Sequence, residues 1–311
     1  MKPFEEVYEK VIKSVDIEKV TYIRDKYKFI NTFIINGLLV VLFVVNDILL
    51  RLYKEYDLIG FCVFLTIVIA LIILPNSLKK LKYKYNKEYK EAILKELVKQ
   101  MDEGLTYDPD NGIEPNVYME SGIDILLPDS VHTEDRIMGT LSNGRNIELS
   151  EVVTYKKVLT VVTSGKPKLK DKVIYNGVFG MYEMKTSYMD KIKVRLENIT
   201  NRLNEKKVDI NQEEFEKYFN VFAGDKEKTT QIFKTKVINS FLDFIKKTNS
   251  KMEIVIDKNK IYFRMDYPDL LEPILKYEPL DKEKMKNYYL SLCYPISVLE
   301  SIEESISNIK Q

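Results

Sequence analysis

The fold class follows from the stretch RIMGTLSNGRNIEL at residues 136–149. Two runs in which apolar and polar residues alternate, Arg136–Leu141 and Arg145–Leu149, flank the tripeptide SNG. An Asn-Gly turn between two runs of this kind is a strong short-range signal of a β-hairpin. We therefore predict an antiparallel pair of strands at this position.

The same alternation predicts further strands downstream. They are expected at residues 152–162, 172–184 and 191–197, and as a second hairpin in which MEIVID and KIYFRM are joined by Lys258 and Asn259. Gly177 and Gly180, inside one of these strands, indicate a bulge or the close approach of another backbone.

Helical spacing of apolar residues returns after the strands. Asn211 and Glu214 predict a capping box at the start of NQEEFEKYF. A long helix is expected over KEKTTQIFKTKVINSFLDFIKK, residues 226–247, and a closing helix from Asp281, kinked at Pro295. This order of strands, helix, hairpin and helix predicts an α+β domain over residues 104–311, with a mainly antiparallel sheet packed with helices.

Two long stretches without a charged residue lie upstream of this domain. They read FINTFIINGLLVVLFVVN at residues 29–46 and LIGFCVFLTIVIALIILPNSL at residues 58–78. A hydrocarbon core of about 30 Å needs roughly 20 helical residues, so we predict an N-terminal two-helix transmembrane hairpin over residues 29–78. A buried helical hairpin is the alternative, which the continuous apolar character of both stretches disfavours.

The basic residues that flank these stretches predict their orientation. They are Lys19, Arg24, Lys26 and Lys28 before the first stretch, Arg51 and Lys54 between the two, and Lys79, Lys80, Lys82, Lys84, Lys87 and Lys90 after the second. Since Lys and Arg stay preferentially on the cytoplasmic side, we expect a two-span protein of the cell membrane with both termini in the cytoplasm.

The segments next to the predicted spans are also expected to be helical. Residues 1–28 should contain an amphipathic N-terminal helix that lies on lipid or packs on the protein, and residues 79–103 a basic juxtamembrane helix. Lys79, Lys80, Lys82 and Lys84 are candidate contacts for anionic lipid headgroups. The positive-inside bias by itself is the alternative explanation for these lysines.

Composition excludes several classes of function. The 311 residues include 48 Lys plus Arg and 47 Asp plus Glu, so the net charge of +1 argues against a dedicated nucleic-acid binder. Two cysteines and one histidine cannot supply a disulfide framework, a four-cysteine zinc site or a multi-histidine metal centre. We predict no cofactor.

Few side chains offer catalytic chemistry. His132 is expected in an exposed loop, and Cys293 is expected to be a small buried apolar side chain. Glu134 and Asp135 are a carboxylate pair that could serve acid–base chemistry or hold a magnesium ion. A solvated charged surface is the expected state of this pair.

Five segments resemble the bacterial family catalogued as domain of unknown function 3137. They read DRIMGTL, ELSEVVTYKK, YNGVFGMYEM, EEFEKYFNVFAGDKEKTTQIFKTKVINSFLDF and KIYFRMDYPDLLEP, in this order, and the resemblance covers roughly Met101 to Pro273. It implies two N-terminal spans before a cytosolic domain, and it supplies no catalytic residue. The resemblance also implies proximity to LemA-type membrane proteins, which are therefore possible partners.

One corner of the domain is a candidate binding surface. In FNVFAGD, residues 219–225, an apolar segment runs through Gly224 and Asp225 into the start of the predicted long helix. Free backbone N–H groups at a helix start attract anions, but an N-cap aspartate would already bind those donors.

Taken together, these features predict a membrane-anchored cytoplasmic scaffold or regulatory binding module. Its expected partners are the lipid bilayer and other membrane or cytoplasmic proteins. A membrane-tethered metal-dependent hydrolase that uses carboxylates and a lipid-binding device are the alternatives.

Overall fold

The computed structural model describes residues 1–51, 76–161, 167–197, 206–273 and 275–309. These residues belong to two compact units. The sheet unit comprises Met1–Ser14, Leu94–Glu272 and Leu280–Gln311, and the helical unit comprises Val15–Ile93 and Pro273–Pro279.

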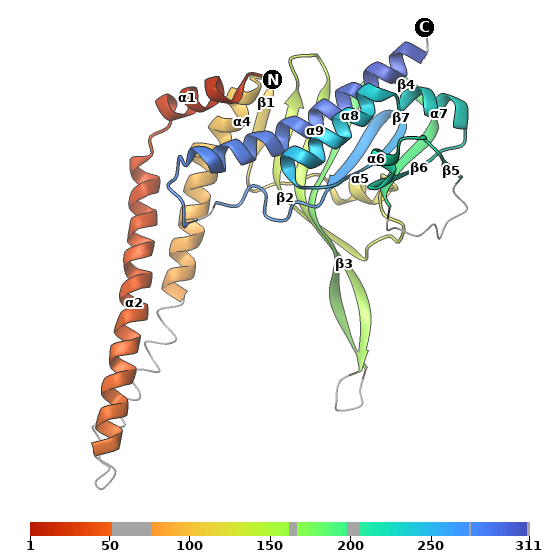
Figure 1. Ribbon diagram of the computed structural model, residues 1–311. Coiled ribbons are helices and arrows are strands. Elements are labelled where there is room, and N and C mark those ends of the chain that lie inside the picture. Colours follow the sequence, from red (N-terminus) through yellow and green to blue (C-terminus); the bar gives the residue numbers. More distant parts are fainter. Residues whose placement is uncertain (52–75, 162–166, 198–205, 274, 310–311) are drawn as a thin grey trace. The chain divides into compact units, whose positions relative to one another are not determined.

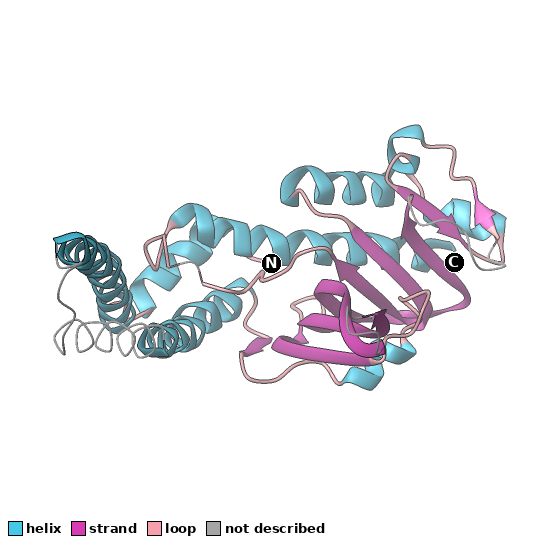
Figure 2. Ribbon diagram, turned by 90° about the horizontal axis from the view of Figure 1, so that it is seen from below, coloured by secondary structure: helices cyan, strands magenta, loops and turns pink. Residues whose placement is uncertain are grey.

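The described part of the sheet unit contains one seven-stranded sheet in which all strand pairs are antiparallel (Figures 1 and 2). The strands follow the order β1-β2-β3-β4-β6-β5, and β7 pairs with β4. Their bounds are β1 Leu105–Asp108, β2 Ser130–Thr140, β3 Asn146–Val161, β4 Pro167–Leu196, β5 Lys207–Val208, β6 Phe219–Phe222 and β7 Met252–Met265. The 30-residue β4 is the central strand, since it pairs with β3, β6 and β7.

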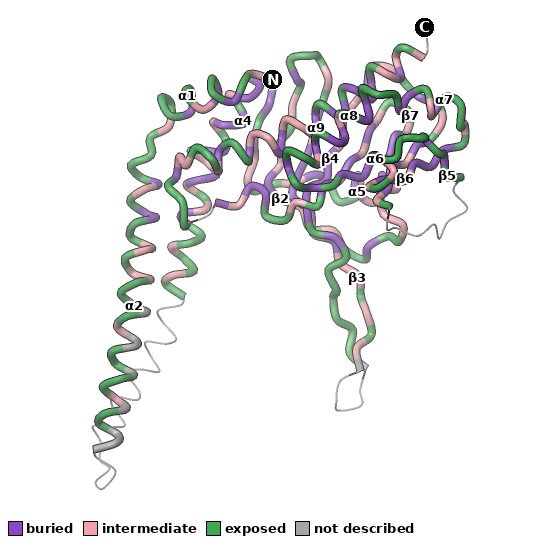
Figure 3. Tube along the Cα trace, in the orientation of Figure 1, coloured by how far each residue is buried: buried purple, intermediate pink, exposed green. Residues whose placement is uncertain are grey.

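Helices cover both faces of this sheet (Figure 2). On one face lie α8 (Thr235–Thr248) and α9 (Lys282–Ile309), and the hydroxyl of Tyr182 in β4 donates to Glu303 of α9 at 2.7 Å. On the other face, Phe179 of β4 packs beside Tyr118 of α5 (Pro115–Glu120), with ring centroids 4.7 Å apart. Buried residues follow the sheet and the helices on it (Figure 3).

The predicted Asn-Gly hairpin is confirmed. It joins β2 to β3, the N–H of Leu141 donates to the carbonyl of Arg145 at 2.8 Å, and Gly144 adopts a φ of +78°. The predicted close approach at the two strand glycines is confirmed as well. A Cβ on Gly180 would lie 2.9 Å from the Glu148 carbonyl oxygen, and one on Gly177 would lie 2.3 Å from the Met265 carbonyl oxygen.

Several predicted strands are parts of longer ones. Residues 145–149 and 152–162 were expected as separate strands and fall largely within β3, while 172–184 and 191–197 both lie largely within β4. The predicted second hairpin is wrong, because β7 continues through Lys258 and Asn259 along one edge of β4. Of these two residues, only Lys258 has a positive φ, +58°, whereas a type I′ hairpin turn needs two such residues.

Two helix predictions are also corrected. The capping box at Asn211 does not form. The helix α6 (Glu213–Glu216) starts from Gln212, and the Glu216 carboxylate instead accepts from the N–H groups of Ile210 and Asn211. The expected long helix over 226–247 is two helices, α7 (Lys226–Ile232) and α8, because the chain turns out of helical conformation at Phe233. The closing helix is present as α9 and continues through Pro295.

The N-terminal helix α1 (Phe4–Ser14) belongs to the sheet unit and packs on protein. Its apolar stripe of Phe4, Val7 and Val11 is buried. The Phe4 ring lies 5.5 Å from the Tyr289 ring in α9, and the Tyr8 hydroxyl donates to the carbonyl of Leu280 at 2.8 Å. Of the two locations considered for this helix, packing on the protein is the one observed.

The helical unit contains α2 (Glu18–Arg51) and a helical segment at residues 76–89. Lys19 of α2 and Glu88 of the segment form an ion pair of 2.6 Å. Arg24 of α2 is buried and pairs with Asp25 at 2.9 Å and with Glu278. Burial raises the pKa of Tyr85 to about 12, against the opposing charge of Arg24.

The predicted basic juxtamembrane helix is not a single α-helix. After the segment at 76–89 the chain forms a π-helical turn, η1 (Lys90–Leu94), and then α4 (Lys95–Met101). The first predicted span, residues 29–46, lies inside α2, whereas most of the second, residues 58–78, lies outside the described residues. Across the described part of the chain, no helix combines the length and the apolar character that crossing a bilayer requires.

Candidate functional site

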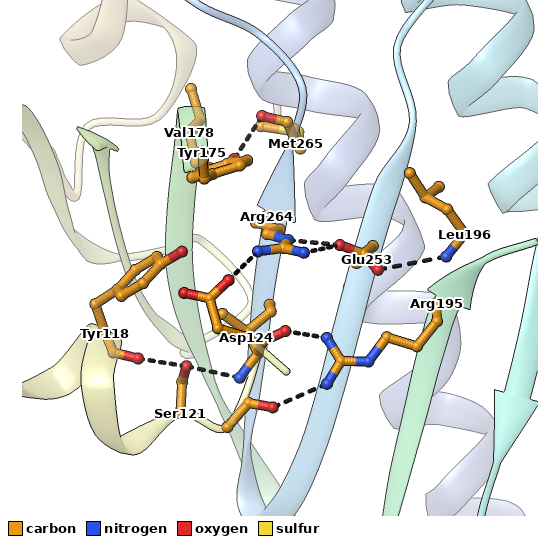
Figure 4. Close-up of polar contacts among 12 residues, drawn as sticks. Tyr118, Ser121, Asp124, Tyr175, Val178, Arg195, Leu196, Glu253, Arg264 and Met265 are labelled. Atoms are coloured by element: carbon orange, nitrogen blue, oxygen red, sulfur yellow. Dashed lines mark hydrogen bonds and ion pairs between the residues drawn. The ribbon is translucent and has the colours of Figure 1, made fainter. Parts of the chain in front are cut away.

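Two groups of buried ionisable side chains lie on opposite faces of the sheet. The first, on the α5 face, is centred on Arg264 of β7, whose guanidinium binds the carboxylates of Asp124 and Glu253 (Figure 4). The side chains of this trio are 13%, 10% and 5% exposed. The guanidinium also lies 5.0 Å from the centre of the Tyr175 ring, within the range of a cation–π contact.

The loop after α5 is what brings Asp124 to Arg264. Gly122 has a φ of +67°, a conformation that glycine adopts without steric cost, and it turns the chain back toward the sheet. The Ser121 hydroxyl accepts from the N–H of Ile123 at 3.1 Å and donates to the carbonyl of Tyr118 at 2.6 Å. Arg195 of β4 donates to the carbonyls of Gly122, at 3.0 Å, and Ile123 (Figure 4).

The charges of this group balance. Two guanidinium groups, Arg195 and Arg264, face two carboxylates and backbone carbonyls. Burial works to lower the pKa of Arg264, but the charges of Glu253 and Asp124 outweigh it and raise that pKa further above its usual range. Burial also raises the pKa of Tyr118 and Tyr175. Groups with such pKa values do not exchange protons near neutral pH, so the arrangement suits positioning of the loop better than acid–base catalysis.

The second group is a cluster of three carboxylates, Glu134, Asp135 and Glu151, whose ligand oxygens lie within 4.8 Å of one another. Glu134 of β2 is opposite Glu151 of β3 in the register. Glu151 is in turn opposite Val178, the neighbour of Phe179, and therefore points to the face that α9 covers. A bulge between Glu134 and Ile137, with a φ of +56° at Asp135, allows the Asp135 carboxylate to be fully buried.

Hydrogen bonds hold the two buried members of this acid cluster. The Tyr107 hydroxyl donates to Asp135, and the N–H of Leu271 donates to Glu151. Burial raises the pKa of Tyr107, and the neighbouring charge of Asp135 raises it further. The pKa of Lys284 is lowered by burial, a change that the charge of Glu151 opposes.

The chemistry of the acid cluster fits a hard divalent cation. Calcium and magnesium prefer carboxylate oxygens, and Glu134 is exposed, so the cluster is accessible from solvent. The expectation of a solvated carboxylate pair at Glu134 and Asp135 is thus wrong for Asp135. Local sequence gave no sign of its burial, because Tyr107 and Leu271, which hold the cluster, come from distant parts of the chain.

At the predicted corner, Asp225 is the N-cap of α7. Its side chain accepts from the N–H of Lys228 at 3.0 Å, and this hydrogen bond lowers the pKa of the carboxyl. The N–H of Asp225 donates to Asp190 at 2.9 Å, and a Cβ on Gly224 would lie 2.9 Å from the same carboxylate. The corner is therefore bound internally, and its role as a binding surface stays a prediction.

The remaining predicted residues are dispersed. Lys79, Lys80, Lys82 and Lys84 are exposed on the helical segment 76–89. His132 is exposed as expected, but it lies in strand β2 and not in a loop. Cys293 is half-buried in α9, and burial raises the pKa of its thiol to about 11, which agrees with an unreactive side chain.

Comparison with known families bears on the C-terminal half of the chain. Residues 173–303 match the family model described as "Protein of unknown function (DUF3137)". Over these residues the chain is similar to this family. The match begins inside β4, ends in α9, and includes Arg195, Glu253 and Arg264 but neither Asp124 nor the acid cluster. It thus confirms the family resemblance, while its bounds lie further along the chain than the expected Met101 to Pro273.

Wider comparisons add one structural similarity to the DUF3137 match. No curated protein matches the chain. Among solved structures, the chain is similar to the crystal structure of the mycobacterial trehalose monomycolate transport factor A, TtfA. The two share 8% sequence identity with a TM-score of 0.32, over 61% of this chain and 88% of the other.

Proposed function

We propose that this DUF3137 protein is a membrane-anchored scaffold or regulatory binding module, held at the bilayer by residues 29–78 with its sheet unit in the cytoplasm. The observation that carries the proposal is the surface of α2. Phe29, Phe33 and Phe43 are 71%, 69% and 76% exposed, in a stretch without a charged residue. Exposed apolar area costs roughly 25 cal/mol per Å² in water, and contact with lipid removes this cost.

A binding role for the sheet unit is supported by the way its charged groups are used. The Arg264 group holds a loop to the sheet, and its raised pKa values do not suit proton transfer at neutral pH. We propose other membrane or cytoplasmic proteins as the partners. The family resemblance makes a LemA-type membrane protein the first one to test.

Membrane extraction tests the anchor. The full chain should stay in the membrane pellet after alkaline carbonate washing. A Val40→Lys and Val44→Lys double variant places two charges in α2 and should increase the fraction of the chain in the supernatant, although residues 58–78 still supply the second proposed span. An Ile12→Lys and Met189→Lys double variant is the matched control, because both residues are exposed apolar side chains outside α2. Release of the unaltered chain would contradict the proposal.

The acid cluster favours a second candidate function, divalent-cation binding as part of a tethered hydrolase. If it holds a cation, calcium or magnesium should raise the Tm of the detergent-solubilised full chain. Glu134→Gln should abolish the rise without unfolding the protein, since Glu134 is exposed. Asp171→Asn, at an exposed position on β4, should leave the rise unchanged. An unchanged Tm with either cation would exclude this function.

A further inference from the structure

The outer parts of β3 and β4 form a two-stranded ribbon, residues 155–160 and 168–174, that extends beyond the rest of the sheet (Figure 1). The β2 pairing ends at Tyr155, and the β7 pairing begins at Val178. Every residue from 168 to 174 is exposed, and the strand opposite is exposed or half-buried (Figure 3). A hairpin without a third strand or a packing surface is only marginally stable in water.

The register of the ribbon separates its side chains into two faces, because residues opposite each other share a face and successive residues alternate. The first face carries the pairs Leu159–Leu169, Lys157–Asp171 and Tyr155–Val173, and the second carries Thr160–Lys168, Val158–Lys170 and Lys156–Lys172. One face is therefore mainly apolar and the other mainly basic.

Protection of the strand edges explains only part of this composition. Lysines on exposed edges prevent pairing with other chains, and the ribbon has five lysines against one aspartate. Edge protection does not account for Leu159 and Leu169, which are 69% and 65% exposed and directly opposite each other. Near the base, Lys156 pairs with Asp129 at 3.0 Å and donates to the carbonyl of Leu127 at 2.8 Å, so four of the five lysines lie outside this ion pair. The Leu127 side chain is exposed as well.

We infer that the ribbon docks on the anionic surface of a lipid bilayer. The lysines are attracted to the negative surface potential, and the leucine pair enters the boundary between headgroups and acyl chains. A protein partner is disfavoured by the residue types, because binding hot spots are rich in Trp, Tyr and Arg. The ribbon has neither Trp nor Arg, and its one tyrosine, Tyr155, lies at the base. The inference does not rest on the proposed anchor.

A fluorescent label on the full chain tests the docking. Cys62→Ser and Cys293→Ser remove the native thiols, and Thr160→Cys carries an environment-sensitive NBD group. The protein is reconstituted into vesicles of phosphatidylcholine alone, or of phosphatidylcholine with an equal amount of phosphatidylglycerol. We expect blue-shifted, stronger NBD emission only with phosphatidylglycerol, and weakening of this signal by added salt.

Charge variants then show whether the ribbon itself is responsible. Lys168→Gln, Lys170→Gln and Lys172→Gln together should abolish the phosphatidylglycerol-dependent shift. The same change at three exposed lysines outside the ribbon should preserve it; these are Lys234, Lys247 and Lys251.

Three results would overturn the inference. The first is equal NBD emission in both vesicle types, and the second is an equal loss of the NBD shift in the control triple variant. The third is a label that stays in water with phosphatidylglycerol vesicles but is shielded from water when a cell extract is added. The last would indicate a protein partner. Flotation with pure phosphatidylcholine vesicles reports on the anchor separately, so failure of one proposal is distinguishable from failure of the other.

Discussion

Asp225 begins α7 at the predicted binding corner, and its carboxylate is the N-cap of that helix. Replacing Asp225 with alanine removes the acceptor for the N–H of Lys228, so we expect Tm to fall by about a few degrees. Asp243→Ala, which removes an exposed carboxylate from the interior of α8, is the control and should leave Tm nearly unchanged. An unaltered Tm for Asp225→Ala would refute the stabilising role of the cap. If this variant also lost binding of a partner, the corner would be functional.

Asp102, which follows α4, should contribute to acid sensitivity. Burial works to raise the pKa of Asp102, but its carboxylate accepts from the N–H groups of Ser142, at 2.9 Å, and Gly104, at 3.1 Å, and the net pKa is lowered. A lowered pKa stabilises the folded state above the unfolded-state value of about 3.9, and this stabilisation is lost as the pH falls through the folded-state value.

Denaturant unfolding between mildly acidic and strongly acidic pH checks this linkage. Asp102→Asn should flatten the dependence of stability on pH below about pH 4, whatever its effect at neutral pH. Asp243→Asn serves as the control and should keep the slope of the unaltered chain. The same slope in Asp102→Asn would show that other carboxyls cause the acid sensitivity.

Residue-scale features were predictable from sequence where the cause is local. The SNG turn is predictable because the positive φ of Gly144 is a preference of glycine itself and depends on no distant residue. The burial of Asp135 was not, because it depends on a bulge in β2 and on Tyr107, 28 residues away. In the sequence, no property of Glu134 and Asp135 indicates that Asp135 is buried and Glu134 exposed.

At the scale of elements, the Arg264 group joins the loop after α5 to β7 and β4. Arg264→Met leaves the carboxylates of Asp124 and Glu253 buried without their cation, which should cost about 3–5 kcal/mol of unfolding free energy. Lys191→Met breaks a partly exposed ion pair with Asp257 and should cost at most about 1 kcal/mol. Chemical denaturation of both variants measures the difference, and equal costs would show that the buried group does not hold the loop.

The bounds of an element are predictable where its own residues determine them. They are not predictable where pairing with another strand determines them. The sequence MEIVIDKNKIYFRM predicts a hairpin, because Lys258 and Asn259 interrupt two alternating runs. Its real conformation is set by β4, whose register against β7 shifts on both sides of Tyr188. That partner lies some 70 residues earlier, beyond the reach of any local pattern.

For the whole molecule, the topological proposal predicts a labelling pattern. In cells that express a chain without native cysteines, a membrane-impermeant maleimide should label Lys54→Cys from outside, although Lys54 lies outside the described residues. Asp110→Cys, in the exposed turn after β1, should react only after the membrane is permeabilised. External labelling at position 110 would reverse the orientation.

The order and type of most elements, and the α+β class, could be predicted for the molecule as a whole. Alternation and helical spacing recur along the chain and are independent of partners. The Arg264 group could not be predicted, because its members come from the loop after α5, from β4 and from β7, and only pairing in the sheet brings them together.

Because β4 is one continuous strand, it limits where the chain can be truncated to give a folded fragment. The DUF3137 match begins at residue 173, in the middle of a strand that runs from Pro167 to Leu196. A fragment cut at the start of the match would lose β3, and with it every backbone partner along one edge between Val173 and Tyr182. Such an open edge recruits other chains, so we expect the fragment to self-associate, and residue 173, where the match starts, is not a folding boundary.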